Sequence, residues 1–275
     1  MSQRPAFPFA LLRFWAWRLA LGWCLIAGMS FLLQFANCAV ASKNQNIQVF
    51  LTFVNLLPNA IREIIGKDAL SAGNIAFIVA LAYEHPIELI LHLSWAAGVP
   101  TGLLVGEVQR GHMELILSRA VTKSQVYFCA LLLTLGGLLA LAPVLCGATA
   151  LGSHLFHYEP PLPISRFWHL AVNFELVCCA TAAVGLVAGS YFHRRNRAVG
   201  VVVAYAVVDQ FILLFSAIWP DLKFISRFSL FHYAKRSEIF SNPDWPLGDM
   251  AILAVIACIL TLAGAIIWNR RDLPS

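Results

Sequence analysis

Long apolar stretches separated by short polar segments fill most of the 275-residue chain. Six stretches are long enough to cross a bilayer as helices, which takes roughly 20 residues each. They cover residues 19–40, 87–105, 126–151, 167–192, 198–219 and 250–268. None of them alternates apolar and polar positions as a barrel strand would. We therefore predict an all-α integral membrane protein with six transmembrane helices, folded as a single transmembrane domain over residues 1–275.

Three shorter segments add to this architecture. Residues 1–18 mix Phe, Trp and Leu with Arg, which favours a helix lying in the membrane interface; a simple flanking belt of aromatic and basic residues explains the pattern equally well. The apolar run 75–83 is too short to span, so we expect it to lie in the interface or to re-enter the membrane. Residues 56–65 carry apolar positions on one helical face and predict a short surface helix.

Composition and charge exclude several classes of protein. Hydrophobic residues make up 60% of the chain and charged residues 12%, whereas a soluble domain carries about 25% charged residues. Eleven of the 19 Lys and Arg residues lie in four segments: residues 1–18, 107–125, 193–197 and the tail after 268. By the positive-inside rule these segments, and both termini, are cytoplasmic. The net charge of +5 reflects this asymmetry, and no nucleic-acid partner is expected.

Motifs for nucleotide or hydrolytic chemistry are missing from the sequence. It contains no GxxxxGK[ST] phosphate loop, no GxSxG turn and no HExxH pair. The seven cysteines have no CxxC spacing, so we interpret them as small buried apolar residues and predict no metal site. The chain is therefore not expected to be an enzyme, and any energy source must come from a partner.

The polar segment after the second span is the only extended cytoplasmic loop. It combines charged residues with an apolar stripe at Met113, Ile116 (or Leu117) and Ala120, which favours a short amphipathic helix. Such a helix could dock into a groove of another protein, or it could rest on the lipid headgroups as a connector. The pattern alone does not separate these two interpretations.

This loop resembles the signature of ABC-2-type transporter permeases, a GE…RG…E-L-x-L-S run followed by P-V-[ST]-[RK]. The matching residues are Gly106, Glu107, Arg110, Gly111, Glu114, Leu115, Leu117, Ser118, Val121, Thr122 and Lys123. Ala120 departs from the pattern, because a proline is usual there. The resemblance extends to His85-Pro86, Arg197-Ala198, the segment 229–233 and Arg271-Asp272.

The resemblance implies a permease subunit of an ATP-driven exporter working by alternating access. Loop 107–125 would be the coupling helix that docks into a cytosolic ABC ATPase subunit, and re-entrant helices would lie within 221–246. ATP and Mg²⁺ would bind the partner and no cofactor this chain; a second permease copy would complete a homodimer in the lipid of the bacterial cytoplasmic (inner) membrane. The residues expected to couple to the ATPase are Glu107, Arg110, Gly111, Glu114, Leu117, Ser118, Arg119 and Lys123.

Several polar residues fall inside the predicted spans. An acidic residue at mid-membrane costs about 2.5–3.5 kcal/mol on insertion scales, so Glu175 and Asp209 should face protein or water. They would line a substrate route or accept hydrogen bonds from neighbouring helices. The residues assigned to the translocation pathway are Gln34, Asn37, His92, Glu175, Tyr205 and Asp209.

Histidines and glycines give weaker signals. Glu84, His85, Glu88 and His92 cluster at the outer mouth of the second span, where Glu88 and His92 could share a metal ion or a proton. We interpret them instead as surface histidines with an ion pair at the interface. The small-residue ridges at 98, 102 and 106 and at 185 and 189 predict sites where another helix approaches closely.

Two other function classes remain open on the sequence. An ion-coupled carrier or an intramembrane enzyme would use Glu175 and Asp209 together with the histidines. A membrane anchor would only scaffold other proteins.

Overall fold

The computed structural model describes residues 8–43, 49, 52–56, 75–234, 236–241 and 244–272. These residues form helices and connecting segments, and no strand occurs among them. The helices are α1 (Phe9–Ala41), α5 (Ile75–Ala80), η1 (Leu81–Glu84), α6 (Pro86–Leu103), α7 (Val105–Gln109), α8 (His112–Leu117), α9 (Lys123–Leu139), α10 (Ala142–Leu155), α11 (Ile164–Tyr191), α12 (Arg195–Ile218), η2 (Pro220–Phe228), η3 (Leu230–Tyr233), α13 (Arg236–Ser241) and α14 (Leu247–Arg270). The surface helix predicted at 56–65 lies, apart from its first residue, outside the described residues.

Six helical units in the described residues are long and apolar enough to cross a membrane, which confirms the predicted number of spans and the all-helical class. The second unit joins α5, η1 and α6, and the third joins α9 and α10. Pro143 lies in the first turn of α10, where its missing N–H costs no helical hydrogen bond. The predicted single helix 126–151 is therefore divided near residue 140.

The short apolar run 75–83 is predicted to lie in the interface or to re-enter the membrane, and the structure shows that it packs inside the protein and continues into α6. Its side chains Phe77, Val79 and Tyr83 are fully buried, and α5 packs against α1 and α13. The Phe77 ring meets the Phe240 ring edge-on at 6.3 Å. The run therefore begins the second span unit instead of forming a separate surface element.

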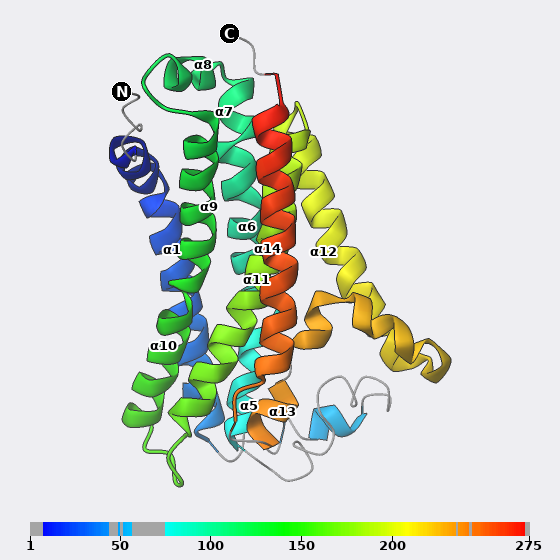
Figure 1. Ribbon diagram of the computed structural model, residues 1–275. Helices are drawn as coiled ribbons and strands as arrows, with labels where there is room; N and C mark the ends of the chain where they lie inside the picture. Colours follow the sequence, from blue (N-terminus) through cyan, green and yellow to red (C-terminus); the bar gives the residue numbers. More distant parts are fainter. Residues whose placement is uncertain are drawn as a thin grey trace.

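At the other end of the bundle, α1 is one continuous helix from Phe9 to Ala41. The predicted boundary between an interfacial segment 1–18 and a span 19–40 is therefore not a break in secondary structure. Figure 1 shows both ends of the described chain at the same end of the bundle as α7 and α8.

Helix α11 lies at the centre and packs against α6, α9, α10, α12 and α14. A Cβ at Gly185 would lie 2.7 Å from the carbonyl oxygen of Ala96, and one at Gly189 would lie 3.0 Å from that of Pro100. The predicted close approach at the α11 ridge is confirmed, and α6 is the helix that approaches.

The glycine ridge of α6 behaves differently. An added Cβ at Gly102 or Gly106 would first meet the Arg195 side chain or local backbone at 3.3–3.5 Å, and one at Gly98 would meet nothing within 4 Å. Among the described residues no other helix brings its backbone close to this ridge; the Arg195 side chain of α12 occupies part of it.

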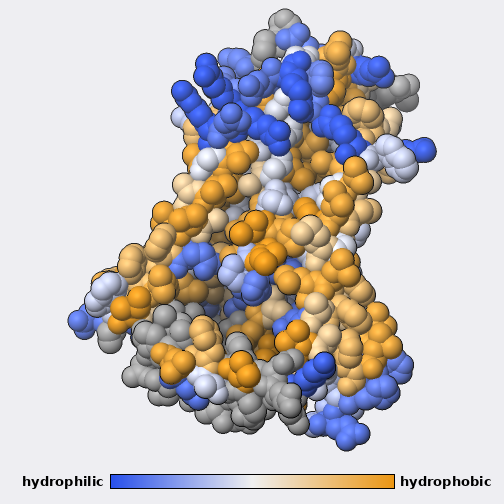
Figure 2. All heavy atoms as spheres, turned by 180° about the vertical axis from the view of Figure 1, so that it is seen from behind, coloured by the Kyte–Doolittle hydropathy of each residue, from blue (hydrophilic) through white to orange (hydrophobic). Residues whose placement is uncertain are grey.

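Large apolar side chains also cover the outside of the bundle. Leu21 and Leu25 on α1, Val203 on α12 and Ile259 and Leu262 on α14 are exposed. Figure 2 shows an apolar surface between polar ends, with hydrophilic residues gathered at the end that carries α7 and α8. This distribution is typical of helices surrounded by lipid tails, and it indicates a multi-pass membrane protein.

Candidate functional site

The loop after the second span folds into two short helices, α7 and α8. Gly111 joins them with φ +74°, a left-handed conformation that glycine adopts without steric cost. The following helix, α9, begins with a capping box in which Thr122 and Gln125 bond each other's backbone N–H groups. This cap starts α9 directly after Ala120 and Val121, where the family pattern has its proline element.

Glu107 is the centre of this segment. Its carboxylate accepts hydrogen bonds from Arg18 Nη2 at 2.7 Å and from Arg110 Nη2, and it lies 3.1 Å from His112 Nδ1. We call these four residues the Glu107 cluster. Burial tends to raise the pKa of Glu107, but the two arginines overcome it and leave that pKa below its ordinary value. Glu107 was predicted to contact a partner, yet it is 1% exposed and ties the loop to α1.

Two further contacts tie the loop to other spans. Gln109 Oε1 accepts a hydrogen bond from the backbone N–H of Arg195 at the start of α12. Lys123 Nζ donates to the backbone carbonyl of Arg271 at the end of α14, and Trp268 Nε1 donates to the carbonyl of Lys123. Lys123, predicted to couple to the ATPase, is the first residue of α9, and its side chain contacts the C-terminal end of α14.

The outer face of α8 has no such attachment among the described contacts to other helices. Glu114, Ser118 and Arg119 are exposed, Leu115 is 67% exposed, and Met113 is buried in the core. Beside α8 and the first turns of α1 lies an apolar groove of about 610 Å³. Of the remaining predicted coupling residues, Arg110 and Gly111 are exposed and Leu117 is half-buried.

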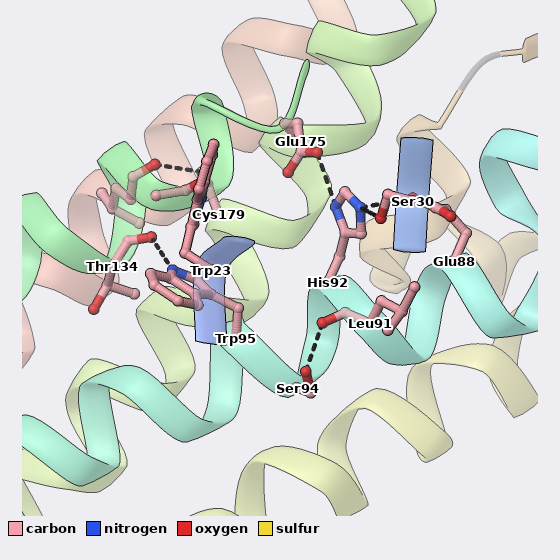
Figure 3. Close-up of polar contacts among 12 residues, drawn as sticks. Trp23, Ser30, Glu88, Leu91, His92, Ser94, Trp95, Thr134, Glu175 and Cys179 are labelled. Carbon is pink, nitrogen blue, oxygen red and sulfur yellow. Dashed lines mark hydrogen bonds and ion pairs between the residues drawn. The ribbon is translucent and has the colours of Figure 1, made fainter. Parts of the chain in front are cut away.

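A second group of polar side chains is buried between the spans. His92 Nε2 lies 2.8 Å from Glu88 Oε1 and 3.2 Å from Ser30 Oγ, and His92 Nδ1 lies 2.8 Å from Glu175 Oε1. Figure 3 shows the His92 ring from α6 pointing between Glu175 of α11 on one side and Ser30 and Glu88 on the other. Cys178 Sγ lies within 4.8 Å of the His92 and Glu175 ligand atoms. We call these five residues the His92 cluster.

The prediction that Glu88 and His92 are surface groups at an interface is wrong. Their side chains are 1% and 0% exposed, and the Phe174 ring of α11 lies 5.1 Å from the His92 ring. The sequence did contain a signal: Glu88 and His92 are spaced i, i+4, and Glu175 and Cys178 are spaced i, i+3, so each pair shares a helix face. What it lacked was the pairing of these two faces.

The polar stripe of α1 joins helices together. Gln34 Nε2 donates to Thr149 Oγ1 at 2.8 Å, and Asn37 Nδ2 donates to the carbonyl of Val79 at 3.0 Å. Gln34 is buried, so its side chain does not face an open pathway in this structure. Both residues were predicted to line the translocation pathway, and both make structural contacts to α10 or α5.

Asp209 has a different partner from Glu175. It is buried, and its carboxylate accepts hydrogen bonds from the backbone N–H groups of Leu230 at 3.0 Å and Phe231 at 3.4 Å. It thereby holds the start of η3, while Tyr205 is half-buried one turn earlier on α12. Since nine residues separate Asp209 from the end of α12, the chain has turned back by about 13 Å along that helix.

An apolar groove of about 780 Å³ runs between α6 and α12. Figure 2 views the molecule from the side that is hollowed there. Its polar lining residues are Ser94, Gln210 and Arg195, together with the backbone at Gly98. None of the six predicted pathway residues is among the described residues that line it.

Comparisons with known protein families, with curated proteins and with solved structures find no match to this chain. The resemblance to ABC-2-type permeases therefore rests on the residues of the loop motif and on the elements that follow it.

Proposed function

We propose that the chain is the membrane-spanning subunit of an ATP-binding cassette transporter, in which α7 and α8 receive the movement of a separate ATPase. The observation that carries the proposal is that the exposed helix α8 lies between residues attached to three spans. The loop from α7 to the start of α9 contacts α1 through Glu107, α12 through Gln109 and α14 through Lys123.

These attachments suit a coupling element mechanically. A force applied to the exposed face of α8 would reach three spans through hydrogen bonds of 2.7–3.1 Å and not through a flexible tether. A connector that only rested on headgroups would need no such contacts. The exposed Leu115 next to a groove gives a docking surface the apolar anchor that helix-in-groove recognition requires.

Charge supports the orientation. Arg110, Arg119, Arg194, Arg197 and Arg270 are exposed, and all lie in the segments predicted to be cytoplasmic. Cytoplasmic segments of membrane proteins carry such an excess of basic residues. In the proposed assembly this end faces the cytoplasm of a bacterium, where two copies of the chain meet two ATPase subunits and drive export of a substrate.

Site-specific crosslinking tests the proposed partner. A photo-reactive amino acid at position 115, in the full chain in native membranes, should capture an ATPase that carries a phosphate loop. The matched control is position 155, where Leu155 is 50% exposed on α10 at the opposite end of the bundle. Capture of the same proteins from both positions, or of no such ATPase from position 115, would contradict the proposal.

Coupling is tested in the purified complex. Glu114→Arg reverses a charge on the exposed face of α8, so transport should fall while ATP hydrolysis continues. Asp221→Arg makes the same change on exposed η2 and should leave both activities unchanged. Equal transport per ATP in the two variants would count against the role of α8.

The His92 cluster favours a second candidate function, an ion-coupled carrier or an intramembrane enzyme. Ionisable groups inside a membrane protein commonly mark such a site. From the sequence, such a carrier or enzyme would use Glu175 and Asp209 together. In the structure Glu175 lies beside His92, whereas Asp209 lies beside η3. In liposomes without any ATPase, a carrier would show proton flux that Glu175→Gln abolishes; no flux above protein-free liposomes would exclude it.

A further inference from the structure

We infer that His92, Glu175 and Cys178 bind one divalent transition-metal ion of the Zn²⁺ type, in a closed site between α6 and α11. The three residues are buried, and one ligand atom from each lies within 4.8 Å of the others. Imidazole nitrogen, carboxylate oxygen and thiolate sulfur together are the donors that Zn²⁺ prefers. The inference is independent of the proposed transport function.

The distance between two of the ligand atoms is close to what an ion requires. Zinc bonds of about 2.0–2.3 Å in a tetrahedron set the ligand atoms about 3.3–3.6 Å apart. His92 Nδ1 and Glu175 Oε1 are 2.8 Å apart. A side-chain rotation that moves the carboxylate oxygen by about half an ångström would bring these two atoms to the separation that the metal needs. The fourth position of the tetrahedron would remain for water or for a second carboxylate oxygen.

Buried carboxylate oxygens without a partner provide the second observation. With both carboxylates ionised and the imidazole protonated, the His92 cluster carries a net charge of −1 on side chains that are 0–1% exposed. Glu175 Oε2 and Glu88 Oε2 are buried without a hydrogen-bond partner among the described residues, while His92 Nδ1 and Glu175 Oε1 lie 2.8 Å apart as an ion pair. Buried acceptor atoms without a partner are costly, and a bound cation would supply the partner that the Glu175 carboxylate lacks.

Glu88 completes the arrangement from the opposite side of the ring. When His92 donates its Nε2–H to Glu88 Oε1 at 2.8 Å, the lone pair of Nδ1 is free to bind a metal. A carboxylate that orients a ligating histidine in this way is common in metal sites. Binding releases one proton from the imidazolium and one from the thiol while the ion adds two charges, so the net charge of the cluster is unchanged.

The burial of the site predicts how the ion behaves. Because all three ligands are enclosed by α1, α6 and α11, the ion would be acquired during folding and would exchange slowly. It would also link α6 to α11 directly. The experiment therefore loads the metal during synthesis and measures what the protein retains.

The full chain is produced in medium supplemented with Zn²⁺ or, separately, Co²⁺, and is purified in detergent with a chelator present. We expect about one ion per chain by elemental analysis and, for Co²⁺, a thiolate-to-cobalt charge-transfer band. Cys178→Ser should abolish that band and Glu175→Gln should lower metal content roughly tenfold or more. Cys179→Ser is the matched control, since Cys179 is also buried but its Sγ faces the carbonyl of Leu135.

Three outcomes overturn the inference: folded wild-type protein without retained metal, cobalt protein without the thiolate band, or equal metal content in wild type and Glu175→Gln. The first two outcomes are measured on the wild-type protein, so the inference can be tested even if a variant does not fold. Loss of the band in Cys179→Ser but not in Cys178→Ser would show that Cys179 is the sulfur ligand. This result would also overturn the inference.

Discussion

The Glu107 cluster and the His92 cluster are built alike but have opposite charge balances. In the first, one carboxylate is shared by two arginines and a histidine, so cations are in excess. In the second, one histidine lies between two carboxylates, so anions are in excess. The arginines of the first are 36% and 46% exposed, whereas the side chains of Glu88, His92 and Glu175 are 0–1% exposed.

Exposure decides what each excess charge costs. At the end of the bundle, water solvates the part of each guanidinium that Glu107 does not contact, so surplus positive charge is inexpensive. Between the spans the side chains of the His92 cluster are almost fully buried, so surplus negative charge is costly there. The Glu107 cluster therefore ties the loop to α1 at the end of the bundle, whereas the His92 cluster between the spans forms the proposed metal site.

Removal of the central histidine should have the largest effect. His92→Ala leaves two buried carboxylates without their shared partner and should lower the free energy of unfolding by about 3–5 kcal/mol. Unfolding in denaturant, monitored by tryptophan fluorescence, measures this change. The triple variant Glu88→Gln/His92→Leu/Glu175→Gln removes all of the charge and should be more stable than His92→Ala. If the single variant is the more stable of the two, charge imbalance does not govern this cluster.

Asp209 is a buried acid met by backbone N–H groups and not by a cation. Asp209→Ala should cost about 2–3 kcal/mol, because two hydrogen bonds to a charged acceptor are lost. Hydrogen exchange should show the amides of Leu230 and Phe231 exposed by this variant and still protected in the neighbouring control Gln210→Ala. Unchanged protection in Asp209→Ala would mean that η3 is held by its apolar contacts alone.

Glu107→Gln should cost less, about 1–2 kcal/mol at neutral pH, because its arginine partners are partly solvated. The lowered pKa of Glu107 means that its ionised form stabilises the fold above the ordinary carboxyl pKa and that this stabilisation is lost as pH falls through the lowered value. The difference between wild type and variant should thus be present at neutral pH and shrink below about pH 4. Glu114→Gln, on the exposed face of α8, should change stability by less than about 0.5 kcal/mol at any pH.

Salt should produce the smallest effect and separate the two clusters. Raising the ionic strength to about 1 M shortens the screening length to about 3 Å, so the cost of Glu107→Gln should fall by some tenths of a kcal/mol. The cost of His92→Ala should not change, because ions do not reach the buried cluster. Equal salt dependence of the two variants would show that water enters between α1, α6 and α11.

Much of the architecture was predictable because membrane insertion imposes it on the sequence directly. Each span must be apolar over about 20 residues, so the six spans follow from composition along the chain, as does the gathering of basic residues at one end. The corrections occur where helices meet. The run 75–83 was too short to interpret alone, and only its packing on α1 and α13 shows that it is interior.

The sequence by itself determined the helical class, the number of spans, the exposed charged loop and the helix faces that carry Glu88 with His92 and Glu175 with Cys178. These are local properties, fixed by hydropathy and by the 3.6-residue period. Only the tertiary structure decided that Glu107 turns inward to Arg18, that Asp209 holds η3, and that the two polar faces of α6 and α11 are paired in the interior. In lipid every apolar face is equally satisfied, so hydropathy does not specify which faces meet; shape and the few buried polar groups do.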